Sequence, residues 1–135
     1  MSQELYEHGL KNRKEVLGEA HVERSFATAD AFTQPYQELV TEYCWGAIWD
    51  RPGLPRKTRS LLNIAMLTAL NREEEFKLHV RAAFRNGVTK DEISEVLLQA
   101  AIYCGVPAAN SAFNQAREVF AQMEGEARAS APKAG

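Results

Sequence analysis

The fold is decided by the stretch TKDEISEVLLQAAIYCGVP, residues 89–107, which contains one whole helix and the break that ends it. Thr89 and Glu92 have the spacing of a capping box, in which each side chain accepts a hydrogen bond from the other residue's backbone N–H. Apolar residues then recur every three or four positions as far as the cysteine, which is the period of an α-helix. The glycine and the proline that follow stop the helix. A second apolar side, at Leu98 and Ile102, predicts a central position or a subunit interface for this helix.

The same period continues in both directions, and no run of four or more residues alternates as a strand would. Capping residues, prolines and glycines divide the chain into helices. They are predicted over residues 3–17, 21–30, 34–50, 55–70, 72–86, 90–104 and 107–123. We therefore predict an all-α fold, a bundle of about six or seven helices in a single domain at residues 1–125. An Ala- and Ser-rich tail at residues 126–135 is expected to be disordered.

Two of these helices have apolar stripes that we expect to form the core. The expected core positions are Tyr36, Leu39, Val40, Tyr43 and Ala47 on the third helix, and Leu61, Leu62, Ala65, Met66 and Ala69 on the fourth. Trp45 and Trp49 are spaced four apart and lie off the stripe of the third helix. Because an exposed tryptophan is unfavourable unless it is covered, we expect this pair to line a subunit interface or a pocket.

Composition excludes several classes of function. The chain has 135 residues and a formal net charge of -2, which gives no electrostatic basis for nucleic-acid binding. Its first residues are polar and acidic, unlike a secretory signal. The longest uncharged stretch, residues 96–116, contains several amide side chains, so we predict two buried helices and no membrane span. Cys44 and Cys104 are predicted to be buried free thiols, which fits a reducing cytoplasm.

His79 is the residue that most favours chemistry, because it shares the apolar side of the fifth helix with Phe76 and Ala83. Such an imidazole is either a hydrogen-bonded part of the core or a proton donor. Glu75 lies one turn before it and could orient the ring and favour the imidazolium. Arg72 lies on the same side, although Arg72 and Glu75 could equally form a solvated surface pair.

The sequence contains no recognisable motif for a cofactor or a metal. A phosphate loop, G-x-S-x-G and H-E-x-x-H are all missing, and the three histidines are spread too widely for a good metal site. We therefore predict no cofactor and no metal. A polar line on the sixth helix, formed by Glu95, Gln99 and Tyr103, is either its solvent side or a buried hydrogen-bonding set.

Several stretches resemble the γ-carboxymuconolactone decarboxylase family in their order and spacing. They are HVER at 21–24, YCWG at 43–46, WDR at 49–51, RSL at 59–61, the segment from His79 through NGVT at 86–89 and EVLLQ at 95–99, and YCGVPA at 103–108. The resemblance covers nearly the whole chain except the tail. It implies an all-α fold of the alkylhydroperoxidase-D-like type, and a homo-oligomeric ring of subunits, commonly a trimer of dimers.

Redox relatives in the wider family carry a C-x-x-C-x-x-x-H motif, whose positions fall here on Arg72, Glu75 and His79. Without the two thiols, peroxidase chemistry of that type is not expected. The resemblance implies instead the cofactor-free conversion of 4-carboxymuconolactone to β-ketoadipate enol-lactone and carbon dioxide. This step belongs to protocatechuate catabolism, the β-ketoadipate pathway of aromatic breakdown.

The resemblance and the residue types together suggest roles in holding an anionic lactone substrate. His79 would be the proton donor or the oxyanion partner, oriented by Glu75. The residues expected to bind the substrate are Arg51, Arg59 or Arg72, which would hold its carboxylates, and Trp45 and Tyr103, which would shape the pocket.

Other functions stay open at this level. The chain could be a decarboxylase or lyase of the same fold that acts on another lactone or β-keto-type acid. It could also be a non-catalytic oligomeric protein that binds a small ligand. A thiol peroxidase would require Cys44 and Cys104 to meet, and the missing C-x-x-C argues against it.

Overall fold

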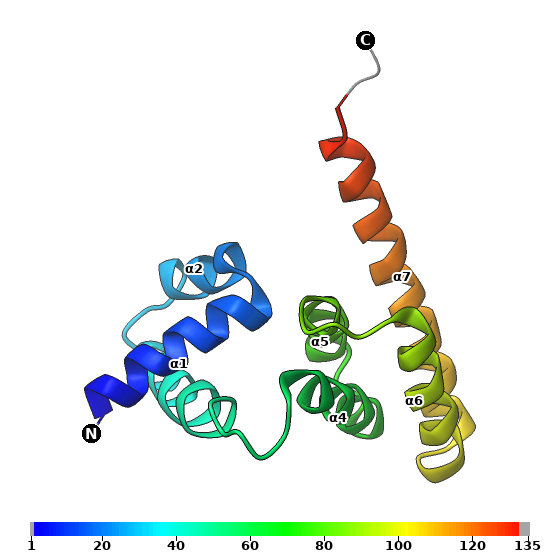
Figure 1. Ribbon diagram of the computed structural model, residues 1–135, viewed down its shortest axis with the longest axis horizontal. Coiled ribbons are helices and arrows are strands. Elements are labelled where there is room, and N and C mark those ends of the chain that lie inside the picture. Colours follow the sequence, from blue (N-terminus) through cyan, green and yellow to red (C-terminus); the bar gives the residue numbers. More distant parts are fainter. Residues whose placement is uncertain (1, 133–135) are drawn as a thin grey trace. The chain divides into compact units, whose positions relative to one another are not determined.

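The computed structural model describes residues 2–132, and every regular element in that range is a helix (Figure 1). In chain order the elements are α1 (Ser2–Leu17), α2 (Glu19–Ala27), α3 (Gln34–Leu39), the π-helix η1 (Val40–Ile48), α4 (Arg56–Leu70), α5 (Glu73–Arg85), α6 (Lys90–Tyr103) and α7 (Val106–Ser130). The prediction of an all-α fold is therefore confirmed.

The helix ends follow the local signals in the sequence. The hydroxyl of Thr89 accepts a hydrogen bond from the Glu92 backbone N–H at 3.1 Å, and the Glu92 carboxylate accepts one from the Thr89 backbone N–H at 3.0 Å, so the predicted capping box is formed. Gly105, with a φ of 105°, separates α6 from α7 in a conformation that favours glycine. Pro107 lies in the first turn of α7. Among the described residues, no helix has both the length and the apolar composition to cross a membrane.

The C-terminal helix is longer than predicted. It continues past the predicted domain end at residue 125 as far as Ser130. The Arg81 guanidinium binds both carboxylate oxygens of Glu126 at 2.9 Å and the Gln122 side-chain oxygen at 3.2 Å, which ties this last part of α7 to α5. Residues 133–135 of the expected tail lie outside the described residues.

The helices form two compact units. The first comprises the chain up to Ser60 together with Ala82–Val88, and the second comprises Leu61–Arg81 together with the chain from Thr89 onward. The first unit therefore contains α1 to η1 with the start of α4 and the end of α5, and the second contains the rest of α4 and α5 with α6 and α7.

In the first unit, α1 packs against η1 with the two backbones in direct contact. A Cβ atom added to Gly9 would collide with the backbone carbonyl of Thr41, and one added to Gly46 would collide with that of Leu5. The side of η1 that faces this contact holds Thr41, Trp45 and Gly46, all of which are buried. In Figure 1 the blue α1 crosses the cyan segment that contains η1.

The predicted core stripe of the third helix was wrong at three of its five positions, while Val40 and Ala47 are half-buried. Tyr36, Leu39 and Tyr43 are 63%, 52% and 51% exposed, whereas Trp45 and Trp49 are buried. The physical reason is the π-helix, because its i→i+5 bonds, such as Trp49 N–H to the Cys44 carbonyl at 3.0 Å, move side chains away from a 3.6-residue stripe. The tryptophan pair is thus covered by the chain itself.

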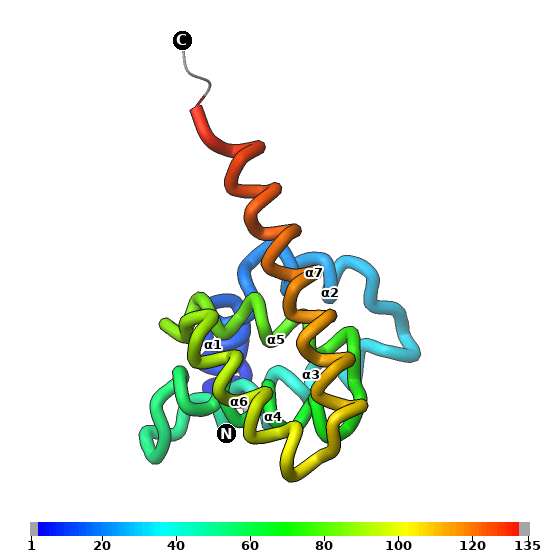
Figure 2. The backbone as a smooth tube through the Cα atoms, turned by 90° about the vertical axis from the view of Figure 1, so that its right-hand side faces the viewer, coloured from blue at the N-terminus to red at the C-terminus, as the bar shows by residue number. Residues whose placement is uncertain are grey.

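In the second unit, α6 and α7 lie side by side, and α7 then continues beyond α6 (Figures 1 and 2). The contact is made by buried apolar residues, which are Ile93, Leu97 and Ala100 on α6 and Ala109, Ala112, Ala116 and Val119 on α7. The alanines allow two helices to approach closely without cavities. Salt bridges run along the rim, for example Lys77 to Glu118 at 2.7 Å and Lys90 to Glu124 at 3.2 Å.

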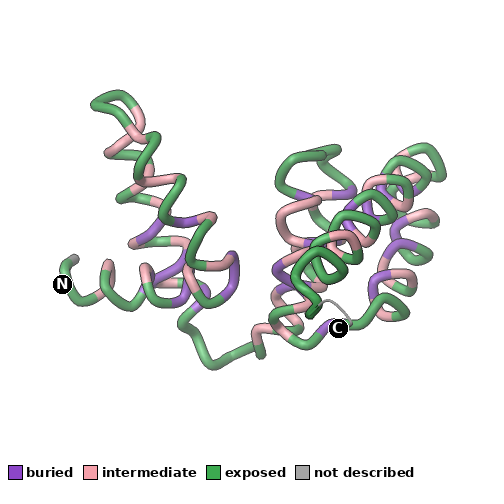
Figure 3. The backbone as a smooth tube through the Cα atoms, turned by 90° about the horizontal axis from the view of Figure 1, so that it is seen from above, coloured by how far each residue is buried: buried purple, intermediate pink, exposed green. Residues whose placement is uncertain are grey.

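The predicted core positions of α4 were also wrong. Ser60, Ile64 and Thr68 are buried, whereas Leu62 and Met66 are 44% and 51% exposed. Hydrogen bonds explain why polar positions can be buried, because the Thr68 hydroxyl donates to the Ile64 carbonyl at 2.7 Å and the Ser60 hydroxyl accepts from the side chain of Asn86 at 2.8 Å. Leu61 and Ala65 are half-buried and Ala69 is exposed. Figure 3 shows short buried stretches that alternate with exposed ones along the helices.

The two thiols differ in burial. Cys44 is half-buried, and burial raises the pKa of its thiol while the nearby Arg13 charge lowers it to a lesser extent. Cys104 was predicted to be buried but is exposed, because α6 ends at Tyr103 and the chain turns away there. Both are free thiols, as predicted.

Candidate functional site

The strongest candidate is His79 in the second unit. It lies in the middle of α5, where Phe76 and Val80 on the neighbouring positions are buried and His79 itself is half-buried. The side-chain nitrogen Nδ2 of Asn63, on α4, lies 3.4 Å from Nδ1 of the His79 ring. A half-buried imidazole with one nitrogen held by a polar partner can still offer its second nitrogen to a ligand.

Arg72 and Glu75 lie beside the start of the same helix. Arg72 immediately precedes α5, and its carbonyl accepts a hydrogen bond from the Phe76 backbone N–H at 2.8 Å. Glu75 is in the first turn, one turn before His79 as predicted. Both side chains are exposed. A carboxylate in the first turn also stabilises a helix through the positive end of its dipole, so Glu75 has a structural role whatever its part in chemistry.

Arg51 and Arg59 belong to the first unit and are linked to each other. An Nη of Arg59 donates to the backbone carbonyl of Arg51 at 3.3 Å. Nε of Arg59 is buried and has no hydrogen-bond partner within the described part of the chain. A buried guanidinium donor without a partner is unfavourable unless an acceptor reaches it, and a carboxylate is a strong acceptor for it. The Arg51 side chain is exposed in the loop before α4.

The two aromatic candidates have opposite environments. Trp45 is only 4% exposed and stacks on Trp49 with ring centroids 4.9 Å apart and an interplanar angle of 24°. Its carbonyl accepts a hydrogen bond from the Asn12 side chain at 3.0 Å. Tyr103 is 83% exposed at the end of α6. The predicted residues therefore divide, with Trp45 in the first unit and Tyr103 in the second.

A buried arginine was missed by the sequence analysis. Arg13 on α1 is 6% exposed, donates to the Thr41 hydroxyl at 3.0 Å and to the Gln37 side-chain oxygen at 2.8 Å, and lies 5.4 Å from the centroid of the Phe26 ring. Burial lowers the pKa of its guanidinium. The signal was present, because Arg13 follows Gly9 by four positions and therefore lies on the face that packs against η1.

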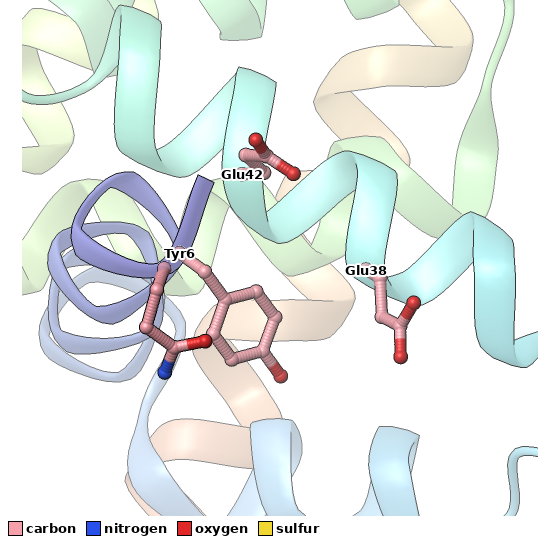
Figure 4. A pocket seen from close by; sticks show the side chains of 4 residues that line it. Tyr6, Glu38 and Glu42 are labelled. Atoms are coloured by element: carbon pink, nitrogen blue, oxygen red, sulfur yellow. The ribbon is translucent and has the colours of Figure 1, made fainter. Parts of the chain in front are cut away.

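Two surface hollows in the structure do not contain the predicted site. The first, of about 350 Å³, is lined by Gln3, Tyr6, Glu38 and Glu42 (Figure 4). The second, of about 330 Å³, is lined by Leu61, Asp91, Glu92, Glu95, Val96 and Gln99, and so includes two residues of the predicted polar line on α6. Both linings carry carboxylates, and within residues 2–132 neither includes an arginine or lysine, which disfavours an anionic substrate there. Among the described residues, no cluster of three or more histidine, cysteine, aspartate or glutamate side chains could hold a metal ion.

Comparison with known proteins finds one matching family and several similar proteins. The model of the Carboxymuconolactone decarboxylase family matches residues 34–118, a range that includes Asn63 and His79. The chain is 50% identical over 121 residues to the 4-carboxymuconolactone decarboxylase of Acinetobacter baylyi, covering 90% of each chain. It is 50% identical over 103 residues to the nitrosuccinic acid decarboxylase of Metarhizium robertsii, covering 76% of this chain and 72% of the relative. An uncharacterized 15.0 kDa protein of Paracoccus denitrificans is 36% identical over 89 residues, covering 64% of this chain and 66% of that one.

Proposed function

Because the chain belongs to the carboxymuconolactone decarboxylase family, we propose that it is a carboxy-lyase that converts 4-carboxymuconolactone to β-ketoadipate enol-lactone and carbon dioxide. The observation that carries this proposal is the 50% identity to a 4-carboxymuconolactone decarboxylase over 90% of both chains. The reaction belongs to protocatechuate catabolism, and we place it in the cytoplasm, where the free thiols Cys44 and Cys104 would stay reduced.

The substrate itself supplies the electron sink for this reaction. The departing carboxylate is on the saturated ring carbon γ to the lactone carbonyl, next to a double bond that is conjugated with that carbonyl. When its C–C bond breaks, the electron pair enters an extended dienolate and carbon dioxide leaves. A proton then adds to the α carbon. The protein must therefore bind a dianion, stabilise negative charge on the lactone oxygen and deliver one proton, and it needs no cofactor for these tasks.

His79 is the side chain that we propose for the proton or for the oxyanion. Its ring is half-buried and one of its nitrogens is in contact with Asn63, so the ring is oriented before substrate arrives. Glu75, one turn earlier on α5, would favour the imidazolium form. A positioned general acid typically contributes about 10²–10⁴ in rate.

Of the three arginines predicted as carboxylate ligands, Arg59 has the best-supported role. Its buried Nε has no hydrogen-bond partner in residues 2–132, whereas Arg51 and Arg72 are exposed side chains. A guanidinium suits the two oxygens of a carboxylate because its donors form a planar fork. The roles expected for Arg51 and Arg72 as further carboxylate ligands, and for Trp45 and Tyr103 as pocket residues, stay predictions.

A homo-oligomer, with a trimer of dimers as the expected form, completes the proposal. Large apolar side chains are exposed on the second unit, namely Leu62, Met66 and Leu70 on α4 and Leu98 and Ile102 on α6. Exposed apolar surface of this kind favours association. Light scattering on the purified protein tests this part, and a monomer at micromolar concentration would contradict it.

A second substrate follows from the relative that decarboxylates nitrosuccinic acid. In that acid the carboxylate next to the nitro group can leave as carbon dioxide while its electrons enter the nitro group as a nitronate, which a proton then quenches at carbon. The tasks for the protein are the same, because this substrate is also a dianion with its own electron sink. A panel containing the lactone, nitrosuccinate and a β-keto diacid separates these candidates by their kcat/KM values.

The experiment that tests the proposed function measures carbon dioxide release from 4-carboxymuconolactone. We expect turnover by the wild-type protein, and a loss of about 10²–10⁴ in kcat in His79→Ala. His8→Ala is the matched control, since His8 is a half-exposed side chain on α1 and its loss should leave kcat unchanged. Full activity in His79→Ala would remove this residue from the mechanism. Normal assembly and tight ligand binding without turnover would instead identify a binding protein.

A further inference from the structure

The contact between Asn63 and His79 involves one particular nitrogen of the imidazole ring. The two atoms that meet are Nδ2 of the asparagine amide and Nδ1 of the imidazole, 3.4 Å apart. With the amide turned so that its NH2 group faces the ring, Nδ1 must accept the hydrogen bond, because an NH2 group can only donate. The single proton of a neutral ring is then on Nε2, the nitrogen that points away from Asn63.

An asparagine can hold this ring in either of its charge states. When the ring is neutral, Nδ2 donates to Nδ1. When the ring is an imidazolium, both ring nitrogens carry protons, and the amide can turn over so that its oxygen accepts from Nδ1–H. A carboxylate in the same place could only accept, and would therefore stabilise the imidazolium and resist proton release.

The position of Asn63 within α4 is consistent with such a role. It lies in the middle of a helix, between Leu62 and Ile64, where asparagine is a poor helix former. Its side chain is half-buried, and its Nδ2 contacts a residue on another helix, α5. The side chain of Asn63 therefore makes a contact between helices instead of competing for the backbone of α4.

From this geometry we propose that Asn63 is the positioning residue of His79. It holds the ring through Nδ1 in both protonation states and so directs Nε2–H toward the substrate. The contact at 3.4 Å is long, as catalytic hydrogen bonds often are before substrate binds. The inference rests on the proposed function for the identity of the reaction, but not for the contact itself.

Charged side chains on α5, α6 and α7 could affect the protonation of the His79 ring. On α5 itself, Glu75 lies one turn before His79. Residues 61–70 of α4 contain no ionisable side chain. From α7, Glu118 and Glu126 reach α5, where they pair with Lys77 and Arg81. From α6, Asp91, Glu92 and Glu95 line the hollow next to Leu61.

The test is an NMR titration of the full-length protein labelled with ¹⁵N-histidine, in which His79→Gln assigns the signal. In the wild type we expect the neutral ring to carry its proton on Nε2. In Asn63→Asp the carboxylate should draw the proton to Nδ1, reverse the tautomer and raise the pKa of His79 by about one unit. Asn63→Leu should lower that pKa relative to Asn63→Asp. Asn114→Asp, which makes the same change at an exposed position of α7, is the control and should leave His79 unchanged.

Measurements of enzyme activity then test whether the contact between Asn63 and His79 matters for the reaction. In Asn63→Leu we expect kcat on 4-carboxymuconolactone to fall about tenfold with KM little changed, because the ring is no longer held in place. In Asn63→Asp the alkaline limb of the pH–rate profile should move up with the pKa of His79.

The possible failures are distinguishable. If His79 has the same tautomer and pKa in Asn63→Asp, Asn63→Leu and the wild type, the positioning role is wrong. The wild-type ¹⁵N shifts decide the same point if a variant does not fold, since a proton on Nδ1 would overturn the inference. If the NMR results are as expected but wild-type protein releases no carbon dioxide from the lactone, the proposed function fails while the contact stands.

Discussion

The two units of the chain are stabilised by different kinds of contact. In the first, α1 and η1 meet backbone to backbone at Gly9 and Gly46, and both Nη atoms of the buried Arg13 donate to neutral polar partners. In the second, α6 and α7 meet through small apolar side chains, and the charged residues form ion pairs at the surface. The same substitution should therefore have different consequences in the two units.

This difference arises because the two kinds of contact contribute to the free energy of folding in different ways. A close backbone contact depends on the absence of a Cβ atom, and a buried hydrogen bond leaves an unsatisfied group when one partner is removed. A single substitution can therefore disrupt either kind of contact. Surface ion pairs and alanine contacts contribute in many small parts, because water and salt screen the former and each methyl group buries little area.

The largest effect is expected from replacing a helical glycine by alanine in each unit. Gly9→Ala places a Cβ atom against the Thr41 carbonyl and should lower the free energy of unfolding by about 3 kcal/mol, since the contacting atom is backbone and cannot turn aside. Gly125→Ala in α7 meets nothing within 4 Å and should raise it by about 0.5–1 kcal/mol through helix propensity. Urea denaturation of both variants measures the two values. Equal effects would show that the units do not differ in this way.

An intermediate effect is expected from replacing an arginine by alanine in each unit. Arg13→Ala leaves the Gln37 oxygen and the Thr41 hydroxyl without their donor in a buried place, and should cost about 2 kcal/mol. Arg81→Ala removes an exposed pair with Glu126 and should cost about 0.5 kcal/mol. Only the second cost should shrink in 1 M salt. A salt-dependent loss in Arg13→Ala would mean that its charge is paired with a carboxylate after all.

Helix ends could be predicted from the sequence because the signals that set them are local. The capping box at Thr89 and Glu92 and the break at Gly105 involve neighbours in the chain, and the structure has both. Asn71 is less informative. It immediately precedes the helix predicted over residues 72–86, where it would be an N-cap, and in the structure it follows α4 in the left-handed conformation, with a φ of 55°. Asparagine favours both kinds of position, so its identity alone does not decide.

Buried faces could not be predicted because they depend on partners far along the chain. Hydrophobicity placed Tyr43 and Met66 inside, where the structure has Thr41 and Thr68. Each of these threonines donates its hydroxyl to the carbonyl four residues earlier in the chain, at 2.8 Å and 2.7 Å, so its methyl group can be buried without leaving a polar atom unsatisfied. The pattern of hydrophobic residues in the sequence does not indicate whether such a hydrogen bond forms.

The candidate site could also be predicted only in part, because some of its contacts depend on residues far apart in the chain. His79 could be selected from its helical spacing with Phe76, and the structure has it half-buried on α5 as that spacing suggested. Its partner Asn63 could not be selected, since it required the face of α4 that the sequence analysis misassigned. Arg59 was a candidate only through the family resemblance, and its buried Nε is visible only in three dimensions.

The smallest effect is expected from the pH dependence of stability, and it concerns the first unit. Burial and then the charges of Arg24, Arg13 and Arg85 lower the pKa of His21 below its ordinary value of 6.5. The folded protein therefore binds fewer protons at this site than the unfolded chain does, so the contribution is fully present above pH 6.5 and is lost as the pH falls toward the folded pKa. His21→Gln removes this loss, because an amide does not titrate.

Thermal melts between pH 8 and pH 5 measure this effect. The Tm of the wild type should fall more on acidification than that of His21→Gln, with His8→Gln as the control for a half-exposed histidine. The expected difference is small because His21 is only half-buried and water screens the arginine charges. If the wild type instead became relatively more stable at low pH, the imidazolium would be favoured in the folded state, and a carboxylate rather than the three arginines would dominate its surroundings.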